Sequence, residues 1–75
     1  MKRSGIVKRS VAIAGHRTSI SLEEPFWTAL QEIAKERGLS AQALIGEIDA
    51  GRGAQNLSSA IRVFVLGALR ERSPL

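Results

Sequence analysis

The chain has 75 residues, with eleven Lys and Arg against seven Asp and Glu, and a formal net charge of +4. A chain of this length forms one domain at most and buries only about 60% of its unfolded surface, so we expect oligomerisation to add stability. The chain has no cysteine, which excludes disulfides and thiolate metal sites, and its single histidine excludes an imidazole-rich metal site. We expect no cofactor.

The positive charge is concentrated at the N-terminal end. Residues 1–22 contain five basic residues and no acidic residue, a charge of +5, whereas residues 23–75 contain six basic and seven acidic residues, a charge of −1. The uncharged run at residues 10–16 is far shorter than the roughly 20 apolar residues of a membrane span, and residues 11–14 are too few for the core of a signal peptide. We therefore expect a cytoplasmic protein that does not interact with membranes.

Residues 1–16 form a basic N-terminal arm with some strand tendency over residues 7–14, and residues 17–22 predict a half-buried strand. Such a strand needs a partner for its backbone groups. The sequence allows pairing with residues 7–14 through a Gly15-His16 turn, or with the same strand of a second chain. The side chains of the strand alternate between two faces, with Thr18, Ile20 and Leu22 on one and Arg17, Ser19 and Ser21 on the other.

Three helices are predicted after the strand, which gives a domain over residues 17–72. The first, residues 24–37, begins with two glutamates and a proline, which suit the positive end of a helix, and stops at Gly38. Ser40 caps a shorter helix over residues 41–49, and a glycine-rich loop follows. Asn56 or Ser58 caps the last helix, residues 57–72, which has a strong apolar stripe.

The polar face of the strand is the first candidate site. The major groove of DNA admits a two-stranded ribbon, and arginine can bind guanine in bidentate fashion while serines can donate or accept hydrogen bonds. Arg17, Ser19 and Ser21 fit that requirement, although many strands simply expose a polar face to water. In the arm, Lys8 and Arg9 are candidates for neutralising phosphates, and Lys2 and Arg3 fit either that role or a solvated tail.

Three segments carry a resemblance to a known family: residues 17–22 running into residues 23–30, then Gly38-Leu39-Ser40, then residues 56–62. Over residues 17–72 the chain resembles the ribbon-helix-helix family of DNA-binding proteins, which contains the Arc and MetJ repressors and many antitoxins. The resemblance implies a mainly α fold with one N-terminal β-strand, and an intertwined homodimer with an intermolecular antiparallel β-ribbon. Here an extra short helix lies between the two main helices.

The resemblance also implies roles for residues. Side chains on the outer face of the ribbon contact bases in that family, which carries over to Arg17, Ser19 and Ser21. In that family, backbone N–H groups at the start of the second main helix bind phosphates. If that helix is residues 57–72 here, the phosphate-binding role carries over to Asn56, Ser58 and Ser59. The alternative is that Ser40 opens the phosphate-binding helix. We prefer the later helix because it is longer and has the stronger apolar stripe.

Catalysis is not expected, since His16, Ser19 and Asp49 supply the residue types of a triad without the sequence context of a nucleophile. We expect sequence-specific binding of double-stranded DNA by a homodimer, as in a bacterial transcriptional regulator. The alternative is an antitoxin-like or adaptor module that binds an acidic protein partner, such as a toxin or a regulator. Binding of single-stranded nucleic acid is disfavoured because the strand has no aromatic residue for stacking.

Overall fold

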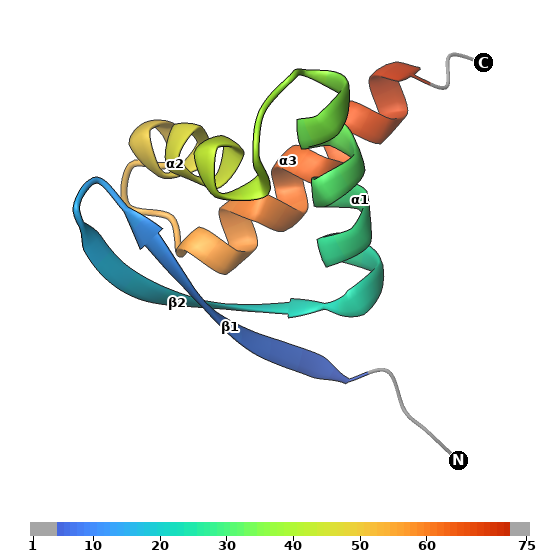
Figure 1. Ribbon diagram of the computed structural model, residues 1–75. Coiled ribbons are helices and arrows are strands. Elements are labelled where there is room, and N and C mark those ends of the chain that lie inside the picture. Colours follow the sequence, from blue (N-terminus) through green and yellow to red (C-terminus); the bar gives the residue numbers. More distant parts are fainter. Residues whose placement is uncertain (1–4, 73–75) are drawn as a thin grey trace.

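The computed structural model describes residues 5–72, so the expectations for Lys2 and Arg3 lie outside the described residues. Two strands form an antiparallel hairpin, and three helices pack on one of its faces (Figure 1). The fold is mainly helical with a β-ribbon and an additional short helix, as predicted. The elements in chain order are β1 (Ile6–Ile13), β2 (His16–Glu23), α1 (Glu24–Glu36), α2 (Ala41–Gly51) and α3 (Leu57–Arg72).

The ribbon differs from the prediction, because the chain has two strands rather than one and pairs them with each other. The hairpin is in register from Ile6 opposite Glu23 to Ile13 opposite His16. Its turn is Ala14-Gly15, one residue earlier than predicted, and both residues have positive φ, 51° and 86°. Positive φ at both turn positions is the pattern of a type I′ turn, whose twist matches that of the strands it joins. Of the two pairings that the sequence allows, the structure has the intramolecular one.

The hairpin contributes one apolar face to the core. Val11 and Ile13 from β1 and Ile20 and Leu22 from β2 are all 6% exposed or less. The three helices complete the core with buried side chains, namely Leu30, Ile33 and Ala34 from α1, Leu44 and Ile45 from α2, and Leu57, Ala60, Ile61 and Val65 from α3. The opposite face of the hairpin is therefore left to solvent.

Local signals explain where the helices begin and end. After α1, Gly38 adopts a φ of +73°, and the N–H of Leu39 donates to the carbonyl of Ala34 at 2.8 Å, which closes the helix. The hydroxyl of Ser40 accepts from the N–H of Ala43 at 3.0 Å and starts α2. This separate cap makes α2 a helix in its own right, and it extends to Gly51 rather than stopping at residue 49.

Within residues 5–72, none of the helices has the length and apolarity needed to cross a membrane. In the same part of the chain, no three His, Asp or Glu side chains cluster as metal ligands would.

Candidate nucleic-acid interface

The outward face of the hairpin gathers the predicted base-contacting side chains. Arg17 and Ser19 are exposed and Ser21 is half-buried, and all three lie on the face turned away from the helices. Because residues opposite each other in a hairpin share a face, the register adds residues of β1 to this group. Lys8 lies opposite Ser21, and Ser10 lies opposite Ser19. We call these five residues the ribbon face.

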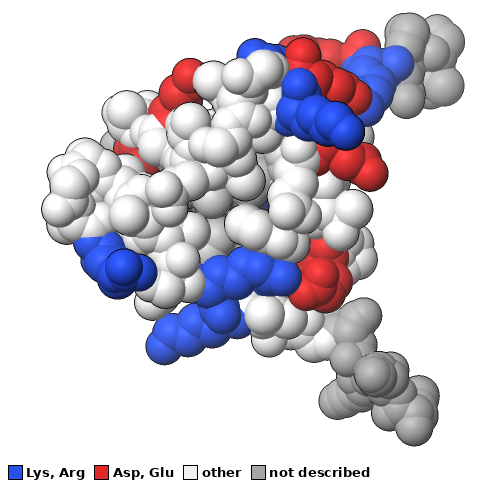
Figure 2. Space-filling view, viewed as in Figure 1, with Lys and Arg blue, Asp and Glu red and all other residues white. Residues whose placement is uncertain are grey.

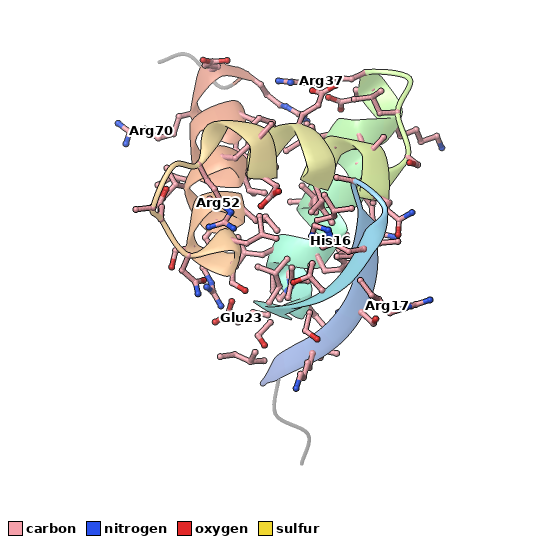
Figure 3. The ribbon with its side chains drawn as sticks, turned by 90° about the vertical axis from the view of Figure 1, so that its left-hand side faces the viewer. His16, Arg17, Glu23, Arg37, Arg52 and Arg70 are labelled. Carbon is pink, nitrogen blue, oxygen red and sulfur yellow. The ribbon has the colours of Figure 1, made fainter. Side chains whose placement is uncertain are left out.

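Arg17 is oriented by a contact within the ribbon face. Its Nη1 donates to the hydroxyl oxygen of Ser10 at 3.3 Å, so the side chain extends across the two strands. Figure 3 shows Arg17 projecting from the hairpin, away from the helices. A guanidinium carries five N–H donors, and this single contact leaves enough of them for a bidentate contact to a base.

Ser10 was not among the residues that the sequence predicted for this face. The signal for it was the alternation within residues 7–13, where Lys8 and Ser10 occupy one face and Val7, Arg9 and Val11 the other. That alternation has meaning only once residues 7–13 are assigned to a strand paired with β2. The hairpin therefore raises the number of polar side chains on the ribbon face from three to five.

The structure separates Lys8 from Arg9, although both were predicted to bind phosphate. Lys8 is exposed on the ribbon face, whereas the side chain of Arg9 turns toward α1. There its Nη2 donates to Oε2 of Glu24 at 2.8 Å, and its guanidinium carbon lies 4.4 Å from the centre of the Trp27 ring. The Nη1 atom is buried without a hydrogen-bond partner among the described residues. Arg9 thus links the hairpin to α1, and its guanidinium group is already paired with residues of α1.

The first turns of α3 are attached to the outer edge of β2. The N–H of Ser21 donates to the hydroxyl oxygen of Ser58 at 3.0 Å, and Nη2 of Arg62 donates to the carbonyl of Ser21 at 3.1 Å. Arg62 also donates from Nε to Oε1 of Glu23 at 2.9 Å. This hydrogen bond from Arg62 lowers the pKa of Glu23 below its ordinary 4.5. The edge of β2 that does not face β1 is therefore covered near its C-terminal end.

The first turn of α2 is attached to the opposite edge of the hairpin. Oε1 of Gln42 accepts from the backbone N–H of Ala12 in β1 at 2.9 Å. The N-termini of α2 and α3 consequently lie on either side of the ribbon. Both ends present N–H groups of a first helical turn, which favour anions such as phosphate.

The predicted phosphate-binding residues at the start of α3 have distinct roles in the structure. Oδ1 of Asn56 accepts from the N–H of Ser59 at 3.2 Å and caps the helix. The hydroxyl oxygen of Ser58 already accepts a hydrogen bond from the backbone N–H of Ser21. Ser40 performs the capping role for α2. Both helices considered for phosphate binding therefore begin beside the ribbon.

Charge is distributed unevenly over the surface. Figure 2 shows Lys and Arg side chains over the part of the molecule where Figure 1 draws the hairpin. At the far ends of α1 and α3, basic and acidic side chains are mixed. A basic patch around a two-stranded ribbon is what binding to the phosphates and base edges of a nucleic acid requires.

Comparison with known proteins gives a family match that covers most of the chain. The chain matches the family described as "Ribbon-helix-helix domain" over residues 6–69, which includes both strands and nearly all of the three helices. No match was found among curated proteins or among solved structures.

Proposed function

Because the chain belongs to the ribbon-helix-helix family, we propose that it binds double-stranded DNA sequence-specifically as a homodimer and acts as a bacterial transcriptional regulator in the cytoplasm. The observation that supports this most strongly is the ribbon face itself. It combines two exposed cations, Lys8 and Arg17, with three serines on a strand pair of the width that the major groove admits.

In this proposal the ribbon face enters the major groove, and its residues make different contacts there. Arg17 contacts guanine, and the hydroxyls of Ser19 and Ser21 contact neighbouring base edges. Lys8 contributes at the rim of the same surface by neutralising a phosphate. Ser10 holds Arg17 in position through the hydrogen bond between their side chains.

Phosphates on the two sides of the groove would be bound by the helix starts that flank the ribbon. On the β2 side these are the backbone N–H groups around Asn56, Ser58 and Ser59, and on the β1 side those that follow Ser40. In this arrangement Asn56 and Ser58 act by fixing the start of α3 next to the ribbon, because their side chains already have partners. No cofactor, metal or catalytic step enters the proposal.

Selection of bound sequences from random duplex oligonucleotides tests this function. We expect the wild type to enrich a defined motif, and the Arg17→Ala variant to lose the preference at one position of that motif. The role of the ribbon would be refuted if the wild type enriched no motif and the Arg17→Ala variant bound DNA with the same affinity as the wild type.

The alternative function is an antitoxin-like or adaptor module that binds an acidic protein. The observation in its favour is the apolar part of α3, where Val63 and Leu66 are 60% and 53% exposed. Retention on immobilised duplex DNA distinguishes the two functions. A DNA-binding protein elutes at a salt concentration that rises with the number of phosphate contacts, whereas an adaptor shows little retention at any salt concentration.

A further inference from the structure

An exposed alanine lies among the polar side chains on the outer side of the hairpin. Ala12 of β1 is exposed, whereas its neighbours Val11 and Ile13 are each 6% exposed and belong to the core. Because side chains alternate along a strand, Ala12 points to the same side as the ribbon face. In the register of the hairpin it lies directly opposite Arg17. An apolar side chain therefore adjoins the arginine that we assign to a guanine.

The position of Arg17 leaves the methyl group of Ala12 uncovered. The guanidinium group of Arg17 donates to the hydroxyl oxygen of Ser10, which lies two residues from Ala12 along β1. Arg17 thus leans along the ribbon toward Ser10 and away from the hairpin turn. A molecule that approaches the outer side of the hairpin can contact Ala12 and the guanidinium group side by side.

The backbone at Ala12 is held in place by a second element. Its N–H donates to Oε1 of Gln42 at 2.9 Å, which attaches this residue to the first turn of α2. The side chain has a single carbon, so the strand can approach the floor of a groove more closely here than a longer side chain would permit. Ala12 is therefore a fixed apolar point on the surface proposed to contact bases.

We propose that the methyl group of Ala12 contacts the C5-methyl group of a pyrimidine in the major groove, and that Ala12 helps to determine which DNA sequence is bound. Thymine presents this apolar group on its major-groove edge, and alanine is one of the side chains suited to contact it. A 5-methylcytosine carries the same group at the same position. The inference rests on the DNA binding of the proposed function and adds a second base to the one assigned to Arg17.

The spacing of the side chains predicts where this pyrimidine lies. Ser10, which holds the guanidinium group of Arg17, and Ala12 are two residues apart on one strand, a distance of about 6.6 Å. Neighbouring bases of one DNA strand are about 3.4 Å apart along the helix axis. The methylated pyrimidine should therefore lie within about two base-pair steps of the guanine contacted by Arg17.

Duplexes that differ only in a C5-methyl group test the contact. The motif enriched by the wild type is synthesised with thymine or deoxyuridine, and with 5-methylcytosine or cytosine, at each pyrimidine near the guanine. Fluorescence anisotropy measures the affinities. At one position we expect the wild type to bind the methylated member of a pair roughly threefold to fivefold more tightly, the effect of burying one methyl-sized group.

The two pairs of duplexes distinguish the two sources of the methyl group. A gain only with thymine over deoxyuridine identifies thymine as the base that Ala12 contacts. A gain only with 5-methylcytosine over cytosine identifies the modified cytosine, and a gain in both pairs shows that the methyl group is recognised on either base.

Ala12→Gly removes the methyl group of the protein and should abolish the preference. Ala12→Ser places a hydroxyl there and should reduce it, which gives a second variant because glycine weakens a strand. Ala54→Gly removes a methyl group from an exposed position in the loop between α2 and α3, and this matched control should keep the preference. Because each preference is a ratio of two affinities of one protein, a general loss of stability does not imitate the result.

The contact is refuted if the wild type binds both members of every pair equally, or if Ala12→Gly and Ala12→Ser keep the full preference. It is also refuted if the preference lies far from the position that Arg17→Ala affects. When the wild type still enriches a motif, these outcomes refute only the role of Ala12. A wild type that enriches no motif refutes the proposed function, and this contact with it.

Discussion

The backbone N–H of Ser21 donates a hydrogen bond of 3.0 Å to the hydroxyl oxygen of Ser58. Ser21 lies near the end of the strand that forms the ribbon face, and Ser58 lies in the first turn of α3. One contact thus satisfies a donor at the strand edge and holds the start of α3 beside the surface proposed to contact DNA. The position of that helix relative to the ribbon depends on this pair and on Arg62, which donates to the carbonyl of Ser21.

Ser58→Ala should lower the free energy of unfolding by about 1 kcal/mol, because a half-buried backbone donor loses its acceptor. Urea denaturation followed by circular dichroism measures the change. Ser59→Ala is the matched control, since the Ser59 hydroxyl makes no hydrogen bond with the described residues, and it should change stability by less than about 0.5 kcal/mol. Equal effects of the two substitutions would contradict the structural role of Ser58.

Arg17→Ala should reduce discrimination between the preferred sequence and a single-base variant by about 1–3 kcal/mol, the value of a bidentate contact to a base. Fluorescence anisotropy with two matched duplexes measures this difference. Stability should change little because the Arg17 side chain is exposed and lies on the outer face of the hairpin. Equal affinity changes on both duplexes would show instead that Arg17 contacts only phosphate.

The neighbours Lys8 and Arg9 should behave in opposite ways. Lys8→Ala should weaken binding to all duplexes alike and reduce the slope of log affinity against log salt by about 1, with little effect on folding. Arg9→Ala should mainly lower stability, by about 1 kcal/mol, because Arg9 contacts Glu24 and stacks on Trp27. Salt titrations and urea denaturation of both variants check the contrast. A loss of DNA affinity in Arg9→Ala larger than in Lys8→Ala would contradict it.

The contrast between these two residues shows how far sequence could predict the site. Alternation within residues 17–22 predicted which side chains of that strand face outward, since period-2 alternation needs only local information. Assigning Lys8 and Arg9 to opposite faces required knowing that residues 6–13 form a strand as well. The turn that decides this contains Ala14 at a φ of 51°, a conformation that alanine seldom adopts, so the local signal for a hairpin was weak.

The contacts that place the helices could not be predicted from local patterns at all. The contact between Ser21 and Ser58 joins residues 37 positions apart, and that between Ala12 and Gln42 joins residues 30 apart. Capping preferences predicted that Ser40 starts one helix and that Asn56 or Ser58 starts the last one, which requires only the adjacent residues. They could not predict which strand edge each helix start would meet, because that depends on how the whole core packs.

Glu23→Gln should make the domain less stable at neutral pH, with a difference from the wild type that shrinks in acid. Arg62 lowers the pKa of Glu23 in the folded state below 4.5, so the carboxylate is stabilised there relative to the unfolded chain. The contribution is complete above pH 4.5 and is lost as the pH falls through the lowered pKa, because the unfolded chain takes up the proton first. Urea denaturation over a pH series should show stability falling more steeply with acid for the wild type than for Glu23→Gln. Arg62→Gln removes the largest cause of the shift and should also show a shallower dependence than the wild type. Parallel profiles for all three proteins would rule out the ion pair as a source of pH-dependent stability.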